Sequence, residues 1–264
     1  MYNDIFSIGP VTIHGYGLMI GIGVMVAILL GDKRAQKRGM NGDLIYGMTI
    51  AAVVFGFLAA RVLFIITEFP NFLKNPIAYI TGSGFVVFGG LIGGIVTVVV
   101  YCKIHKVNPI DYIDLMAPSV ALAQGFGRIG CLLAGCCYGR ETTSAIGIMF
   151  THSDFAPNGV KLLPTQIIMS VGDFIIAAVL LIYAKKERKK GSSLCLWLIM
   201  YSVGRFFVEF LRNDYRGNIG ILSTSQFIGI IMVVVVTLVY IFVVPKLNET
   251  VAVKQTEDIE TSEE

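Results

Sequence analysis

The sequence predicts an all-α integral membrane protein with seven transmembrane helices, the N-terminus outside the cell and the C-terminus in the cytoplasm. Three observations lead to this prediction. The 264 residues are 55% hydrophobic and only 15% charged, which is too apolar for an ordinary soluble domain. Apolar runs near the ~20 residues that cross a bilayer recur along the chain. Lysine and arginine are concentrated in alternate loops, as in multi-pass membrane proteins.

The expected spans follow one another without a long linker. The first, residues 15–31, comes after a short start that contains Asp4 and no basic region, so we expect no cleavable signal peptide. The fourth is the least apolar, because it contains Pro118, Gln124 and Arg128. The other expected spans are residues 44–66, 84–102, 112–133 (the fourth), 167–184, 193–211 and 219–244.

Basic residues set the predicted orientation. They follow the first span at Lys33 to Arg38, the third at Lys103 and Lys106, and the fifth at Lys185 to Lys190. Cytoplasmic loops have this excess of positive charge, so the N-terminus is expected outside. Without a fourth span the loop Lys185 to Lys190 would face outward, which favours seven spans over six. We expect one membrane domain over residues 1–246 and a disordered acidic cytoplasmic tail over 247–264.

This orientation places several polar side chains at the same depth, near the outer leaflet. They are His14, Tyr16, Arg61, Arg128, Arg205, Glu209 and Arg212. A guanidinium inside a membrane costs about 2.5 kcal/mol or more, so it normally faces a protein interior or a wet cavity. Several arginines near the level of the lipid head groups suit a phosphate, which their forked donors bind in pairs. The alternative is that the arginine side chains extend to the membrane–water interface or form contacts that hold neighbouring helices together.

Spacing predicts two local contacts. Arg205 and Glu209 are four residues apart and Glu209 and Arg212 three apart, so the three share one helical face and can pair. In the third span Gly89 with Gly93, and Gly90 with Gly94, form small-xxx-small pairs. Such pairs let two membrane helices approach closely.

The five cysteines do not have the spacing of a metal site. They stand at positions 102, 131, 136, 137 and 195 without a C-x-x-C pair, so we expect no metal and no cofactor. Cys131 could form a disulfide with Cys136 or Cys137 on an oxidising outer side. Cys102 and Cys195 fit small apolar core positions.

Nucleic acid is not an expected partner. The run Lys185 to Lys190 determines membrane orientation, and Gly125-Phe-Gly-Arg-Ile-Gly130 lies within a span, where a G-x-G-x-x-G pattern does not indicate a dinucleotide site.

A motif in the fourth run carries a family resemblance. Gly127-Arg-Ile-Gly-Cys131 followed by Gly135-Cys-Cys-Tyr-Gly139 is similar to the signature G-R-x-G-N-F-x-N-G-E-x-x-G of prolipoprotein diacylglyceryl transferases. These bacterial enzymes attach a diacylglyceryl group to the lipobox cysteine of preprolipoproteins. Arg128 falls on the family's essential, phosphatidylglycerol-binding arginine. The other matches, in the same order as in the family, are His14 to Leu18, Arg61, Phe88 to Gly93, Pro164 to Gln166, and Arg205 with Glu209.

The resemblance implies a transferase of the bacterial cell membrane whose site opens toward the outer leaflet. Its partners would be phosphatidylglycerol, the lipobox peptide and membrane lipids. The substrate thiol would attack the glyceryl carbon and displace glycerol phosphate, which needs a thiolate and a stabilised leaving group. The implied catalytic residues are Arg128, Arg205, Glu209 and, as candidate bases, His14 and Tyr16. Those implied to bind phosphatidylglycerol are Arg128, Arg61, Arg205 and Gly139.

Several positions depart from the family pattern. Phe88 replaces a histidine, Cys131 an asparagine and Cys136 a glutamate, and Ile168 with Met169 replaces Tyr-Glu. Two alternatives therefore stay open. One is a paralogue that keeps a phospholipid-binding cavity with altered or no transferase activity. The other is a lipid or anion transporter whose arginines line the path.

Overall fold

A computed structural model describes residues 4–8, 11–82, 84–213 and 218–248 of the chain. These residues divide into two compact units. The first combines Met1–Leu29 with Asp114–Glu264, and the second is Leu30–Ile113. The predicted acidic tail lies outside the described residues from position 249 onward.

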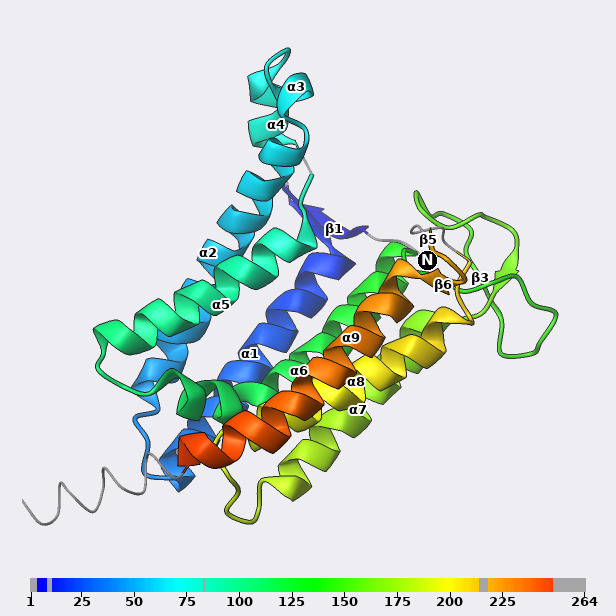
Figure 1. Cartoon of the computed structure of the whole chain (residues 1–264). Helices are drawn as coiled ribbons and strands as arrows, with labels where there is room; N and C mark the ends of the chain where they lie inside the picture. The colour runs from blue at the N-terminus through cyan, green and yellow to red at the C-terminus, as the bar shows by residue number, and fades with distance from the viewer. Residues whose placement is uncertain (1–3, 9–10, 83, 214–217, 249–264) are drawn as a thin grey trace, which may run out of the picture. The chain divides into compact units, whose positions relative to one another are not determined.

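Long helices make up most of the chain (Figure 1). In chain order they are α1 (Gly15–Lys37), α2 (Asp43–Thr67), α5 (Val87–Ile104), α6 (Pro109–Ala134), α7 (Thr165–Tyr183), α8 (Ser192–Glu209) and α9 (Thr224–Leu238). A π-helical turn, η1 (Val239–Val243), continues α9. Two short helices, α3 (Phe69–Phe72) and α4 (Pro76–Thr81), lie between α2 and α5.

Five of these helices are long and apolar enough to cross a membrane, among the residues described: α1, α2, α5, α7 and the segment Thr224–Asn248. The prediction of a multi-pass helical membrane protein is confirmed. The other two predicted spans are helical as α6, with 26 residues, and α8, with 18. Both contain ionisable side chains, among them Arg128 in α6 and Arg205 in α8.

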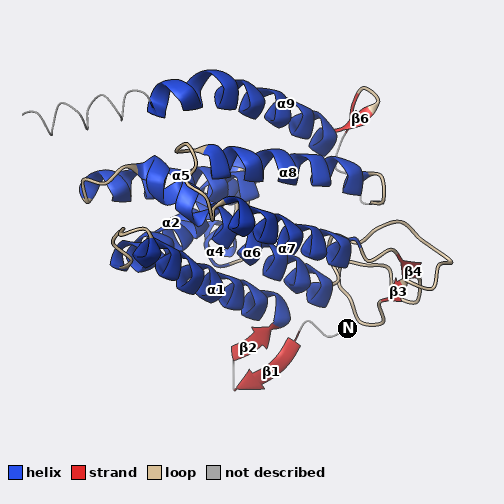
Figure 2. Cartoon of the chain, turned by 90° about the horizontal axis from the view of Figure 1, so that it is seen from below, coloured by secondary structure: helices blue, strands red, loops and turns tan. Residues whose placement is uncertain are grey.

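Short β-hairpins accompany the helices, so the described part of the chain is mostly helical. Figure 2 shows strands outside the helices, and each pairs antiparallel with its neighbour in sequence. The pairs are β1 (Asp4–Ile8) with β2 (Val11–His14), β3 (Ile148–Met149) with β4 (Lys161–Leu162), and β5 (Asn218–Ile219) with β6 (Leu222–Ser223). Four of the six strands among the described residues have only two residues, too few to produce an alternating hydrophobic pattern.

In the first unit α8 lies between α7 and α9 (Figures 1 and 2). A buried cluster of Ala121 from α6 with Ile176, Ala177 and Leu180 from α7 packs against residues of α8 such as Trp197. The start of α8 is held by α6, because the buried Asp114 carboxylate accepts a hydrogen bond of 2.8 Å from the Leu194 amide. This satisfies a helix amide that has no acceptor within its own helix.

In the second unit α2 and α5 approach closely through glycines, as the small-residue pairs predict. A Cβ at Gly89 would lie 2.6 Å from the Ala59 carbonyl oxygen and 3.0 Å from the Ala60 Cα atom. A Cβ at Gly94 would have one neighbour within 4 Å, the Ala52 carbonyl oxygen at 3.8 Å. The contact therefore requires the absence of a side chain at Gly89 far more than at Gly94.

Gly89→Ala should destabilise the protein by about 1–3 kcal/mol, because the added methyl group must push α2 away. The measurement is the thermal unfolding midpoint of the purified protein in detergent. Gly94→Ala is the matched control and should leave the midpoint unchanged or raise it, since alanine favours helix. Equal midpoints for the two variants would contradict this account of the helix contact.

Candidate active site

Arg128 is the charged group around which polar residues of three helices gather. It lies in α6, half-buried, and its Nη2 atom donates a hydrogen bond of 3.4 Å to the Tyr201 hydroxyl of α8. It also interacts electrostatically with Asp173 of α7. The predicted site arginine thus has a phenol and a carboxylate beside it, which keep its guanidinium in place inside an apolar bundle.

Asp173 is a further polar residue of the site, and it is not among the site residues predicted from the sequence. Its side chain is buried, and its Oδ2 atom has no hydrogen-bond partner among the described residues. The signal was available, because an aspartate within the apolar run 167–184 is an ionisable group inside a predicted span.

A small pocket between α7 and α8 is lined in part by Asp173. The pocket has a volume of about 50 Å³, enough for a few water molecules or part of a head group. Its lining comprises Ile168, Met169, Gly172, Asp173, Ile176, Tyr201, Gly204, Arg205 and Val208. Asp173, Tyr201 and Arg205 are therefore the polar residues in a lining that is otherwise apolar.

Arg205 is fixed on two sides. Its Nη1 atom forms an ion pair with the Glu209 carboxylate, and its Nη2 atom donates a hydrogen bond of 3.0 Å to Ser225 at the start of α9. The Nε atom of Arg212 lies 4.0 Å from the same Glu209 carboxylate. The predicted pairing along one helical face is confirmed, and all three side chains are largely buried.

The chain turns sharply after α6, and this turn contains the second half of the glycine motif. The Cys136 amide donates to the Cys131 carbonyl oxygen at 3.1 Å, and the turn uses a positive φ of 74° at Gly135 and 60° at Cys137. Glycine adopts such a φ without strain, whereas cysteine does not. The turn brings residues 136 and 137 back beside the end of α6.

Two buried side chains at the start of α7 hold this turn. The Thr165 hydroxyl donates to the Cys137 carbonyl oxygen, and the Gln166 amide donates to the Cys136 carbonyl oxygen, each at 2.7 Å. The segment Pro164 to Gln166 therefore has a structural task in the site, which the resemblance alone did not specify.

Gly139 is required by close packing of backbone. A Cβ there would lie 2.7 Å from the Leu211 carbonyl oxygen and 2.8 Å from the Leu163 carbonyl oxygen. The Gly139 amide also donates to the Leu163 carbonyl oxygen at 3.0 Å. These contacts explain the glycine by packing, and its predicted contact with phosphatidylglycerol stays a prediction.

Gly139→Ala should lower both stability and activity, because the methyl group would separate the signature loop from Leu163 and Leu211. We expect a destabilisation of about 1–3 kcal/mol, measured from the thermal midpoint in detergent. Gly21→Ala in α1 is the control, since nothing lies within 4 Å of a Cβ at that position. A Gly139→Ala protein as stable and active as Gly21→Ala would show that the close approach is not needed.

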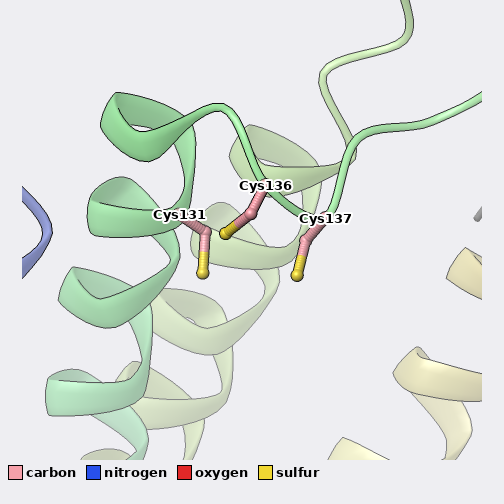
Figure 3. Close-up of side chains that lie close together, drawn as sticks. All are labelled: Cys131, Cys136 and Cys137. Carbon is pink, nitrogen blue, oxygen red and sulfur yellow. The ribbon is translucent and has the colours of Figure 1, made fainter. Parts of the chain in front are cut away.

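The three cysteines of the motif lie together (Figure 3). The Sγ atoms of Cys131, Cys136 and Cys137 are all within 4.8 Å of one another. No disulfide joins any of the five cysteines, all of which lie in the described part of the chain. Hydrogen bonds with the Cys131 and Cys136 thiols, together with the Arg212 guanidinium, lower the pKa of the Cys137 thiol. The spacing of these cysteines along the chain does not indicate that their sulfur atoms converge.

The two candidate bases have different surroundings. The His14 side chain is 54% exposed, and its Nδ1 atom lies 2.6 Å from the Asp4 carboxylate of β1. Tyr16 packs against α6, where a Cβ at Gly130 would be 3.1 Å from its ring, and it interacts electrostatically with Arg128 and Cys131. The structure therefore brings Tyr16 to the signature motif and places His14 beside Asp4 in the β1–β2 hairpin.

Arg61 and Phe88 belong to the other compact unit. The Arg61 Nη1 atom donates to the Gly84 carbonyl oxygen at 2.5 Å, and the guanidinium lies 5.6 Å and 5.3 Å from the ring centres of Phe64 and Phe85. Its Nη2 atom is buried without a partner among the described residues. Phe88 is 58% exposed near the start of α5. Phosphate binding by Arg61 stays a prediction.

Known proteins match this sequence along nearly the whole chain. The sequence is 48% identical over 232 residues to a phosphatidylglycerol–prolipoprotein diacylglyceryl transferase of Clostridium tetani, covering 88% of this chain and 93% of that protein. It is 49% identical over 230 residues to transferase 2 of Clostridium perfringens, covering 86% and 90%. A Staphylococcus haemolyticus transferase is 33% identical over 244 residues, covering 90% and 86%. The family profile described as prolipoprotein diacylglyceryl transferase matches residues 3–242, and the chain belongs to this family.

Proposed function

We propose that the protein transfers the diacylglyceryl group of phosphatidylglycerol to the lipobox cysteine of preprolipoproteins, the first step of bacterial lipoprotein maturation. Family membership supports the reaction, and the position of Arg128 supports the site. Arg128 lies beside Tyr201 and Asp173, and the pocket with Asp173, Tyr201 and Arg205 opens between α7 and α8. A guanidinium, whose forked donors can bind two oxygen atoms, is what a phosphate diester within a membrane needs.

The reaction replaces a carbon–oxygen bond by a carbon–sulfur bond. The thiolate of the lipobox cysteine attacks the glyceryl carbon that bears the phosphate, and glycerol phosphate leaves with the electron pair. Negative charge builds on the leaving phosphate, where Arg128 stabilises it electrostatically. Arg205 lines the pocket, and Glu209 and Ser225 hold its guanidinium in place before substrate arrives.

The orientation in the membrane follows from loop charge. We propose that α6 and α8 also span, giving seven spans, with the N-terminus outside and the Lys185 to Lys190 loop in the cytoplasm. The signature turn after α6 and the Arg205–Glu209 pair late in α8 then lie near the outer leaflet of the bacterial cell membrane. Lipobox cysteines of exported precursors would reach the site from that side.

Transfer by the purified protein in vesicles tests the function. Vesicles containing phosphatidylglycerol and a lipobox peptide should yield a peptide heavier by one diacylglyceryl group, together with released glycerol phosphate. A peptide with serine in place of the cysteine, and vesicles of phosphatidylethanolamine alone, are the controls and should yield neither. Intact phosphatidylglycerol and unmodified peptide after prolonged incubation would favour the paralogue without transferase activity.

A further inference from the structure

Three thiols converge where α6 ends, and the reaction outlined above uses none of them. The Sγ atoms of Cys131, Cys136 and Cys137 lie within 4.8 Å of one another, and Figure 3 shows the three side chains on one side of the turn. Thiolates at ~2.3 Å from one tetrahedral zinc ion are roughly 3.8 Å apart. Small side-chain rotations would therefore bring all three sulfur atoms onto one ion.

The backbone that carries two of these thiols is held in place. The Thr165 and Gln166 side chains, both fully buried, donate to the Cys137 and Cys136 carbonyl oxygens at 2.7 Å. Cys137 adopts a φ of 60°, a conformation that costs an L-residue free energy and persists only where the surroundings impose it. A ligand set supported in this way is preorganised for binding.

The surrounding charge suits a thiolate-bound cation. Three thiolates and one Zn²⁺ carry a net charge of −1, which is costly inside a membrane protein without compensation. Arg128 interacts electrostatically with Cys131 and Cys137, and Arg212 forms a hydrogen bond and an electrostatic interaction with Cys137. Two guanidinium groups are thus close enough to offset the charge of the site.

We propose that Cys131, Cys136 and Cys137 bind one zinc ion with an open fourth position, and that this position takes the thiol of the lipobox cysteine. Thiolates select soft or borderline cations, and zinc with three protein ligands keeps a position for water or substrate. The inference rests on the proposed function, to which it adds the group that activates the nucleophile. It also gives a use to Cys131 and Cys136, which stand where the family resemblance expects asparagine and glutamate.

The step balances without a further reactant. Binding to zinc releases the proton of the substrate thiol to water, because a coordinated thiol is deprotonated. The zinc-bound sulfur then forms the bond to the glyceryl carbon, and the carbon–oxygen bond to phosphate breaks with both electrons on oxygen. The resulting thioether is a weaker ligand than the thiolate, so the product can leave the ion.

Metal binding is tested with the full-length protein in lipid nanodiscs. We expect one zinc per chain by elemental analysis, and after replacement by Co²⁺ the intense absorption of a tetrahedral cobalt thiolate. Cys131→Ala, Cys136→Ala and Cys137→Ala should each weaken Zn²⁺ binding at least ~10-fold in a competition titration with a chelator. Cys102→Ala and Cys195→Ala, in buried cysteines of α5 and α8, are the controls and should bind as the unmodified protein does.

Binding of the substrate thiol at the fourth position of the zinc ion is tested with the lipobox peptide. Adding the lipobox peptide to the cobalt-loaded protein should shift its visible spectrum, whereas the peptide with serine in place of cysteine should not. Removing zinc should abolish transfer, and returning it should restore transfer.

Three results would overturn the inference. Zinc retained equally by Cys131→Ala would indicate an adventitious ion only. A disulfide between two of the three cysteines that persists in the active enzyme would exclude a three-thiolate site. Full transfer by metal-free protein would remove the role of zinc and leave the proposed function intact. Absence of transfer with zinc bound would instead contradict the proposed function, while the cobalt spectrum would still report the metal site.

Discussion

Arg128→Ala should reduce kcat/KM for diacylglyceryl transfer by about 10²–10³-fold or more, the size expected when one electrostatic contact to a developing charge is removed. Arg128 supplies the positive charge that α6 contributes to the site, and it lies beside Tyr201 and Asp173. An alanine at position 128 removes this positive neighbour of the Asp173 carboxylate. Steady-state assays with phosphatidylglycerol vesicles and a lipobox peptide give kcat and KM separately.

Arg128→Lys separates charge from geometry. Lysine keeps the positive charge but cannot donate two parallel hydrogen bonds to a phosphate. We therefore expect activity between that of the alanine variant and that of the unmodified enzyme, with most of the loss in kcat. Arg188→Ala, in the predicted cytoplasmic loop, is the control and should change neither constant. If Arg128→Ala retained more than a tenth of the activity, another residue would have to hold the phosphate.

The sequence predicts much of the fold because a helix that crosses a membrane is apolar over most of its length. Five of the predicted apolar runs correspond to helices that are long and apolar enough to cross a membrane. The two more polar runs form the helices α6 and α8. The Arg205, Glu209 and Arg212 contacts are also predictable, since helical spacing alone puts them on one face.

Contacts between distant segments could not be read in the same way. The turn after α6 depends on Gly135, on the positive φ of Cys137 and on hydrogen bonds from Thr165 and Gln166, which come from almost thirty residues further along the chain. Three thiols at spacings of five and one residues therefore converge without any recognisable metal-binding pattern. Asp173 is a different case. The sequence shows an aspartate within an apolar run, but its proximity to Arg128 depends on how α6 packs against α7.

Glu209→Gln should destabilise the protein by about 3–5 kcal/mol, since removing one partner of a buried ion pair leaves the other charge uncompensated. Glu209 is 8% exposed, pairs with Arg205 and lies 4.0 Å from the Arg212 Nε atom, so two guanidinium groups would lose their anion together. The protein is unfolded in mixed micelles by raising the fraction of a denaturing detergent, and unfolding is monitored by the fluorescence of Trp197. Comparison with the unmodified protein gives the change in the free energy of unfolding.

A double variant shows whether the ion pair serves stability or catalysis. Arg205→Met with Glu209→Leu replaces the pair by apolar side chains of similar size, an exchange that is often neutral or stabilising in buried positions. We expect the free energy of unfolding of this double variant to exceed that of Glu209→Gln by about 2 kcal/mol or more. We also expect it to be as inactive as Arg205→Met alone. Recovered stability without activity would mean that the pair is retained because it orients Arg205 toward the phosphate. Recovered activity would contradict a phosphate-binding role for Arg205.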